Sequence, residues 1–156
     1  MRLIVGLGNP GEKYGNNRHN VGHMTVDALL DGPLPKGFIV KKTDSYMNES
    51  GIFVKKLVEQ YHLDISNLWV IHDDLDIPLG SFKIQLGRGP KIHKGLMSID
   101  RELGTDAYWH VRIGVDNRSL NDRTPGEEYV LKDFNQEELK IVGEVIEKAV
   151  RELLKR

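Results

Sequence analysis

The sequence contains no cysteine among its 156 residues. This absence excludes a disulfide framework, a thiol nucleophile and a zinc site built on cysteine, and it fits a reducing compartment. No apolar run approaches the roughly 20 residues of a membrane-spanning helix. An excess of either charge is also absent, since 22 basic and 23 acidic residues give a formal net charge of −1. Global charge therefore argues neither for nor against a nucleic-acid partner.

The sequence also lacks internal repeats and low-complexity segments. Its length predicts one domain over residues 1–156 with a core of ordinary size. Because the chain enters an apolar strand pattern at once, we expect no secretory signal. Together these absences lead us to expect a cytoplasmic protein that does not contact membranes.

A glycine-rich loop follows the first apolar run, residues 3–5. Residues 6–11 have the Gly-x-Gly-x-x-Gly spacing of a dinucleotide-binding loop. In such a loop the last glycine opens a helix whose N-terminus holds the pyrophosphate. Here residues 15–17 are Gly-Asn-Asn, which are poor helix formers, and Pro10 disfavours helical geometry just before it. We therefore expect a long polar loop that brings to the end of the strand the side chains of Asn9, Tyr14, Arg18, His19 and Asn20.

Hydrophobic periodicity predicts strands that alternate with helices. The predicted strands cover residues 3–7, 38–40, 68–72, 82–86 and 109–115. The predicted helices cover residues 20–30, 51–62 and 94–103, and a last helix begins at Asn135, where Glu138 forms a capping box. Residues 31–37, 87–93 and 117–128 are expected to be loops. The alternation is typical of the α/β class with a mixed, mostly parallel sheet.

Polar residues cluster at the predicted ends of strands and starts of helices. Since working residues of such sheets gather beyond the carboxyl ends of the strands, we expect these segments to surround one cleft. The segments are residues 9–20, 45–51, 72–76 and 87–95.

This set of residues suits the hydrolysis of an activated ester. A neutral His19 can take a proton from water, because the ordinary pKa of histidine lies near working pH. Asp73 can hold the other ring nitrogen and stabilise the imidazolium. Asn9 or Asn48 can donate an N–H to the developing oxyanion or position the water. The simpler interpretations are a surface histidine, a turn asparagine at position 9 and a helix N-cap at Asn48 or Ser50.

Two groups of residues are alternative candidates for a metal site. Asp73, Asp74 and Asp76 resemble a magnesium cluster, although such clusters often only cap a turn. His19 and His23 have the i, i+4 spacing of a zinc-binding helix, but no glutamate lies between them. We expect neither a metal nor a cofactor.

A basic segment between Ser81 and Leu96 contains no acidic residue. Its simplest interpretation is a solvated loop. The more specific interpretation is a basic patch beside the cleft that contacts phosphate and attracts a nucleic acid. The residues assigned to phosphate contact are Lys83, Arg88, Lys91, and, as extensions of the patch, Arg18 and Arg112.

The motifs in order resemble those of bacterial-type peptidyl-tRNA hydrolases. The matching motifs are residues 3–11 with Tyr14, residues 18–22, residues 46–51, residues 72–80 and residues 112–114. The resemblance implies a monomeric α/β/α domain that cleaves the ester between a peptide and the 3′ ribose of tRNA, and so recycles tRNA from stalled translation. It implies no metal or cofactor.

The resemblance also implies roles for single residues. His19 would be the general base and Asp73 would orient it, while Asn9 and Asn48 would bind substrate and place water and carbonyl. The residues expected to line the substrate site are Tyr14, Asn20, Met47, His93 and Lys94. Met47 is equally interpretable as core filler.

The chain departs from the family pattern at several places. Lys94 stands where the family usually has asparagine, and a lysine offers a charge to phosphate instead. Residues 90–92 are bulkier than the glycines usual before the histidine. Gln85 replaces a commonly basic residue, Asn17 replaces threonine, and the stretch between Leu30 and Ser45 is short enough that a strand is expected to be missing or truncated. A non-catalytic RNA-binding relative and a dinucleotide-binding module are therefore kept as alternatives.

Overall fold

The computed structural model describes all residues 1–156 and contains one five-stranded sheet. The strands are β1 (Arg2–Gly6), β2 (Phe38–Lys42), β3 (Leu68–Pro78), β4 (Phe82–Leu86) and β5 (Trp109–Asp116). Their order is β2-β1-β3-β5-β4, in which only β4 is antiparallel to its neighbour. The predicted α/β class with a mixed, mostly parallel sheet is thus confirmed.

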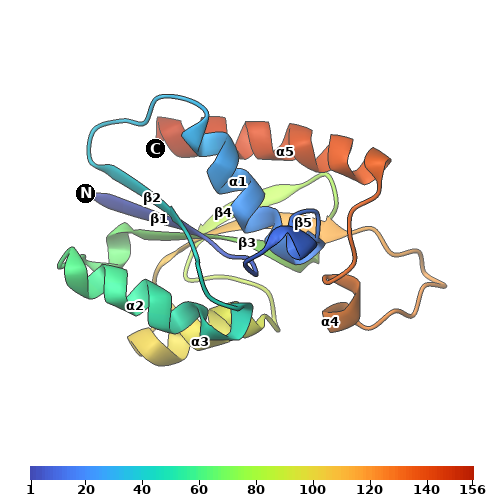
Figure 1. The fold of residues 1–156 in the computed structure, drawn as a ribbon, viewed down its shortest axis with the longest axis horizontal. Helices are drawn as coiled ribbons and strands as arrows, with labels where there is room; N and C mark the ends of the chain where they lie inside the picture. Colours follow the sequence, from blue (N-terminus) through green and yellow to red (C-terminus); the bar gives the residue numbers. More distant parts are fainter.

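Helices cover both faces of this sheet (Figure 1). The α-helices are α1 (Val21–Leu30), α2 (Ser50–Gln60), α3 (Lys94–Leu103), α4 (Gly126–Tyr129) and α5 (Gln136–Lys155). One apolar core joins α1 and α5 to the sheet, and a second core joins α2 and α3 to its other face. The three layers follow from the alternation of side chains along buried strands, since Ile4 faces the first core and Leu3 and Val5 face the second.

The strand order creates a switch point between β1 and β3. From β1 the chain turns through α1 to β2 on one side, whereas from β3 it continues to β4 and β5 on the other. In open α/β sheets the crevice beyond the carboxyl ends of strands at such a point is where ligands bind. Residues that follow β1 and residues of β3 therefore meet there.

Glycines allow the chain to pack closely at this point. A Cβ on Gly6 would overlap the carbonyl of Gly22 at the start of α1, and a Cβ on Gly8 would overlap the ring of His23. The glycine pattern thus serves the contact of α1 with β1. No α-helix follows Gly11, because the chain makes only 3-10 turns at Glu12–Tyr14 and Arg18–Asn20. The dinucleotide-binding alternative has no helix N-terminus at which to place a pyrophosphate.

Several predicted boundaries need correction. The strand expected to end at residue 72 continues to Pro78, because Asp73 and Asp74 pair with β5. Neither Asn48 nor Ser50 caps α2, which begins after a 3-10 turn at Met47–Glu49 and has no side-chain cap. The expected loop 117–128 contains the start of α4. The strand predicted at residues 38–40 extends to Lys42 as β2, and it is the only strand between Leu30 and Ser45.

The other elements agree with the predictions. Strand β4 and helix α3 have the predicted bounds. Asn135 caps α5, and its reciprocal hydrogen bonds with Glu138 form the predicted capping box. No helix has both the length and the apolar character that a membrane crossing requires.

Candidate active site

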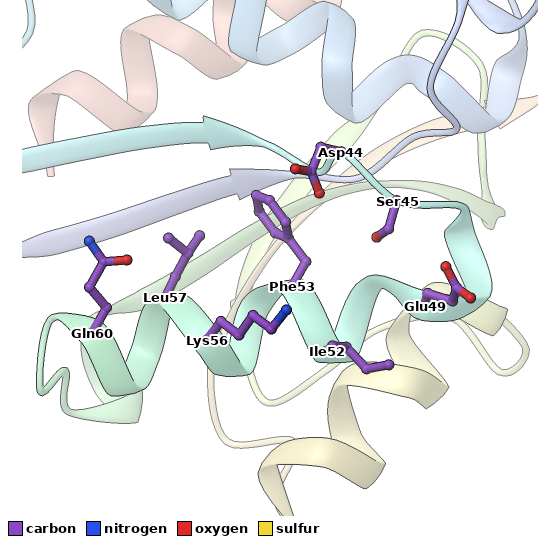
Figure 2. Close-up of a pocket in the computed structure, with 8 residues that line it drawn as sticks. All are labelled: Asp44, Ser45, Glu49, Ile52, Phe53, Lys56, Leu57 and Gln60. Carbon is purple, nitrogen blue, oxygen red and sulfur yellow. The ribbon is translucent and has the colours of Figure 1, made fainter.

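A cleft of about 1120 Å³ lies where the polar segments converge. It contains eight of the predicted site residues, Asn9, His19, Met47, Asn48, Asp73, Lys91, His93 and Lys94. The far wall is formed by residues 125–131, which include α4 and which the sequence did not indicate. A second cavity of about 470 Å³, between the end of β2 and α2, contains none of these residues (Figure 2).

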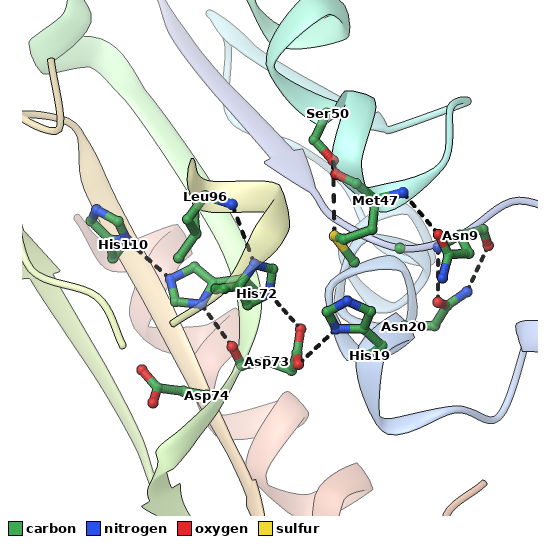
Figure 3. Close-up of polar contacts among 12 residues, drawn as sticks. Asn9, His19, Asn20, Met47, Ser50, His72, Asp73, Asp74, Leu96 and His110 are labelled. Carbon is green, nitrogen blue, oxygen red and sulfur yellow. Dashed lines mark hydrogen bonds and ion pairs between the residues drawn. The ribbon is translucent and has the colours of Figure 1, made fainter. Parts of the chain in front are cut away.

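Asp73 links two histidines at the centre of the cleft (Figure 3). His19 Nδ1–H donates to Asp73 Oδ2 at 2.9 Å, and His93 Nε2–H donates to Asp73 Oδ1 at 2.8 Å. Because a carboxylate only accepts hydrogen bonds, the proton of a neutral His19 ring resides on Nδ1. Its Nε2 is therefore left as a lone pair that can accept a proton.

The electrostatics of this pair keep Asp73 ionised and stabilise the protonated form of His19. Burial lowers the pKa of His19, but the charge and hydrogen bond of Asp73 outweigh burial and raise it above its ordinary value. Burial raises the pKa of Asp73, but the charges and hydrogen bonds of the two histidines hold it far below its ordinary value. Asp73 therefore stays ionised and stabilises a positive charge on His19.

His93 lines the cleft, but both nitrogens of its ring are bonded within the protein. It is buried and caps α3, where its Nδ1 accepts from the Leu96 N–H at 3.2 Å while its Nε2–H donates to Asp73. Both ring nitrogens are therefore used within the protein, and the ring positions Asp73. A histidine just before a predicted helix signals a cap, but the sequence alone does not reveal its second partner.

The same bonds disfavour a metal ion at this cluster. Ligand atoms of His19, Asp73 and His93 lie within 4.8 Å of one another. A metal on His93 Nε2 would need the ring proton on Nδ1, yet that nitrogen already accepts the Leu96 N–H. The cluster fits a hydrogen-bonded network better than a metal centre.

The residues of the other two candidate metal sites are also bonded to groups of the protein. His23 Nε2 bonds to Thr43 Oγ1 at 2.9 Å, away from the Asp73 pair. Asp74 pairs with the buried Arg112 at 2.7 Å, and Asp76 accepts the Lys91 N–H at 2.9 Å. The carboxylates of Asp73, Asp74 and Asp76 therefore bind three different groups.

Asn9 is held so that its amide N–H₂ is free (Figure 3). Its Oδ1 accepts the Met47 N–H at 2.8 Å, which places Nδ2 on the opposite side as the unused donor. The backbone of Asn9 exchanges two hydrogen bonds with the side chain of Asn20, at 2.9 and 2.8 Å. Asn20 is buried and outside the cleft, so its predicted contact with substrate is corrected to one with the Asn9 backbone.

Arg18 and Arg112 do not face solvent, and their predicted contact with phosphate is corrected. The Arg18 guanidinium pairs with Glu138 at 2.8 Å, and both side chains are buried. Arg112 pairs with Asp74 and also donates to Gln85 at 2.6 Å. A buried guanidinium whose charge is already matched offers nothing to an external phosphate.

The remaining predicted residues lie at the surface or beside the cleft. Lys83, Arg88 and Lys91 are exposed, and of these only Lys91 lines the cleft. Tyr14 is partly buried and lies outside it. Met47 lines the cleft yet is only 5% exposed and packs in the core with α2 and α3, so it is a core residue whose contact with substrate stays a prediction.

Comparisons with known proteins agree with this geometry. The sequence model of the family described as peptidyl-tRNA hydrolase matches residues 3–155. A peptidyl-tRNA hydrolase of Aliarcobacter butzleri is 39% identical over 96% of this chain and 88% of its own length, and that of Aquifex aeolicus is 36% identical over 99% and 89%. The crystal structure of the Acinetobacter baumannii peptidyl-tRNA hydrolase superimposes with a TM-score of 0.85 at 28% identity, over 99% of this chain and 88% of that one. The chain belongs to the peptidyl-tRNA hydrolase family.

Proposed function

We propose that this chain is an enzyme that hydrolyses the ester bond between a peptide, or an N-blocked amino acid, and the 3′ ribose of tRNA. Membership of the family supports this activity. The observation that carries the proposal is the His19–Asp73 pair, which leaves a basic nitrogen at a cleft large enough for a peptide end and a nucleotide.

In the proposed reaction His19 acts as a general base. Its Nε2 removes a proton from a water molecule as the water oxygen attacks the ester carbonyl carbon. The resulting tetrahedral intermediate collapses by breaking the bond to the ribose 3′ oxygen, which takes the proton from the imidazolium. The products are tRNA with its 3′ hydroxyl and the peptide carboxylic acid, which releases its proton to water and leaves as the carboxylate. Asp73 keeps the His19 ring oriented and offsets its transient charge.

Two asparagines can form hydrogen bonds with the oxygen atoms that take part in the reaction, those of the ester carbonyl and of the water. The free Nδ2 of Asn9 can donate to the carbonyl oxygen as it becomes negative. Asn48 is exposed on the same cleft and can place the water or the substrate carbonyl. Met47 contributes its backbone N–H to fix Asn9, and its side chain supports the cleft from the core. We keep the expected contact of Tyr14 with the peptide as part of the proposal.

We assign tRNA phosphate contact to the exposed basic residues Lys83, Arg88 and Lys91. Because the net charge is −1, only such a local patch can attract RNA. Lys91 connects this patch to the cleft.

We further propose that residues 1–156 act as one monomeric, cytoplasmic domain without a cofactor. The His19–Asp73–His93 network and the residues around it come from a single chain, which supports a monomer. Peptidyl-tRNA arises during translation, which supports a cytoplasmic location. Sedimentation at micromolar concentration would show a mass near 17.7 kDa for a monomer. A non-catalytic RNA-binding relative is not favoured, because it would have no need of the intact His19–Asp73–His93 network.

Replacing the base tests the activity directly. His19→Ala should lower peptide release from N-acetyl-aminoacyl-tRNA by about 10²- to 10⁴-fold, the range of general-base catalysis. Its affinity for uncharged tRNA, measured by fluorescence anisotropy, should stay near that of the wild type. The matched control is His62→Asn, because His62 is exposed and asparagine tolerates its φ of 49°. Unchanged turnover in His19→Ala would refute the assignment of the base, and RNA binding without any turnover by the wild type would favour the non-catalytic alternative.

A further inference from the structure

Lys94 places a positive charge in the cleft beside the catalytic pair. It is the first residue of α3 and directly follows His93, whose ring is bonded to Asp73. Its side chain is 66% exposed and lines the same cleft as His19. Its charge acts on His19, where it lowers the pKa against the larger opposite effect of Asp73. The ammonium therefore lies on the cleft to which His19 contributes the base.

The ammonium of Lys94 forms one ion pair, with the carboxylate of Glu127 on α4. Lys94 Nζ lies 3.4 Å from Glu127 Oε2, and the Glu127 side chain is 78% exposed. This separation exceeds the roughly 2.7–2.9 Å of a strong charge-assisted hydrogen bond. Two exposed and mobile side chains at this distance contribute little to stability. The pair can therefore be exchanged for a better anion at small cost.

The proposed substrate carries such an anion on the nucleotide that holds the ester. In tRNA the terminal ribose is esterified at its 3′ side and has a phosphodiester at its 5′ side. When the ester carbonyl lies at His19, this phosphate is one nucleoside away from it, a distance that the cleft of about 1120 Å³ can accommodate. A phosphate oxygen accepts shorter and stronger hydrogen bonds from an ammonium than the present Glu127 contact provides.

The other cations at the cleft are less suited to this contact. Arg118 is already bonded to Asp116 at 2.8 Å and to the Thr124 carbonyl at 2.8 Å. Lys91 belongs to the loop before α3, and its backbone is held by Asp76. Neither of them adjoins His93 in the chain as Lys94 does.

We propose that Lys94 is a specificity-determining residue that exchanges Glu127 for the phosphate of the 3′-terminal nucleotide when substrate binds. The proposal rests on the hydrolase activity, and it assigns to this side chain the recognition of a phosphorylated over an unphosphorylated terminal nucleoside. Glu127 is the competitor that the substrate phosphate must displace.

The test compares two small esters that differ only in the phosphate. One is 3′-O-(N-acetyl-aminoacyl)-adenosine, and the other is the same ester with a methylated phosphate diester at the 5′ position. The measured quantity is the ratio of their kcat/KM values. We expect Lys94→Met to lower this ratio about tenfold, the loss of one charge-assisted hydrogen bond, and Lys94→Arg to keep it within about threefold of the wild type. Glu127→Gln should raise the ratio, whereas Glu128→Gln removes the same charge from α4 without breaking an ion pair and should change it less.

Several results would overturn the proposal. One is a ratio in Lys94→Met equal to that of the wild type, because the ammonium would then not contact the phosphate. Another is an equal fall of the ratio in Glu127→Gln and Lys94→Met, because the ion pair itself would then be required. A wild type that cleaves peptidyl-tRNA but does not prefer the phosphorylated ester would refute this inference alone. A wild type that cleaves neither the esters nor peptidyl-tRNA would refute the proposed function as well.

Discussion

At the scale of single residues, Asp73 has the most constrained environment in the cleft. Its two carboxylate oxygens accept from His19 and His93, which come from opposite sides of the sheet layer. Each histidine makes a further contact that fixes it, since the Val130 carbonyl accepts the His19 backbone N–H and His93 caps α3. The base is therefore oriented by elements that are far apart in the sequence.

Asp73→Asn tests this orientation. The amide has no charge and presents an N–H₂ group to one of the two histidine N–H groups, so we expect kcat to fall by about 10²- to 10⁴-fold. Loss of the carboxylate charge also removes what raises the pKa of His19, so the acid limb of the profile of kcat/KM against pH should move to lower pH. The control is Asp76→Asn, which changes a carboxylate that contacts neither histidine. An acid limb that stays in place in Asp73→Asn would contradict the proposed pairing.

At the scale of elements, α4 and the segment after it depend on Arg18. Its guanidinium donates to the carbonyls of Lys132 and Asp133 at 3.1 and 3.2 Å and lies 4.0 Å from the centre of the Tyr129 ring. The side chain thus joins the turn before His19 to the far wall of the cleft. The sequence shows only a basic residue beside a histidine, and its partner Glu138 lies 120 positions away.

Arg18→Met should therefore act on stability. Removing one partner of this buried pair leaves Glu138 without its cation, and we expect a loss of about 3–5 kcal/mol in the free energy of unfolding. Urea denaturation would measure it, with Arg118→Met as the control, since that partly exposed pair with Asp116 should cost less than about 1 kcal/mol. A variant of unchanged stability with weakened tRNA binding would restore the original phosphate assignment.

The loop between β4 and α3 is the element expected to meet RNA. Lys91 is exposed there, while its backbone N–H is anchored to Asp76. Lys91→Ala should weaken tRNA binding and reduce the slope of log affinity against log salt by about 1, the signature of one lost phosphate contact. Lys56→Ala is the matched control, because Lys56 lies on α2 and lines the second cavity, not the cleft (Figure 2). An unchanged slope in Lys91→Ala would mean that the loop faces away from RNA.

At the scale of the whole molecule, buried neutral histidines link folding to pH. His72 accepts from His110 at 3.0 Å behind the catalytic pair. Burial lowers the pKa of His72 well below its ordinary 6.5, and burial together with the charge of Arg112 lowers that of His110 to about 4. Burial and the charge of Lys42 lower the pKa of His23 to about 4 as well. The unfolded chain therefore binds more protons at these sites than the folded protein between pH 6.5 and about 4.

The protein should consequently lose stability as the pH falls through this window. His19 acts in the opposite direction, because its raised pKa contributes stability below pH 6.5 that is lost as the pH rises through its folded value. Three lowered histidines against one raised histidine still predict a falling unfolding temperature below pH 6.5, measurable by calorimetry. His110→Asn keeps a donor toward His72 without a titrating ring, so its unfolding temperature should depend less on pH. An equal dependence in the wild type and this variant would contradict the role of His110.

The local features of this protein could be predicted from its amino-acid sequence alone. Periodicity located nearly every strand and helix, Asn135 and Glu138 defined the start of α5, and the motif order indicated the family and the His19–Asp73 pair. The strands, the helices and the cap of α5 depend on residues a few positions apart or on patterns within one element, so short-range chemistry is sufficient to predict them. The family and the His19–Asp73 pair, 54 positions apart, were indicated by the resemblance of motifs along the chain.

Which polar residues are free to contact a ligand depends instead on the packing of the folded chain. Burial and charge pairing turned Arg18, Arg112, Asn20 and His93 from expected ligand contacts into supports of the cleft. Strand order brought β1 beside β3, and α4 closed the cleft opposite Lys94. These outcomes depend on contacts between distant segments, because the exposure of a charged side chain is a property of everything packed around it and not of its neighbours in the chain.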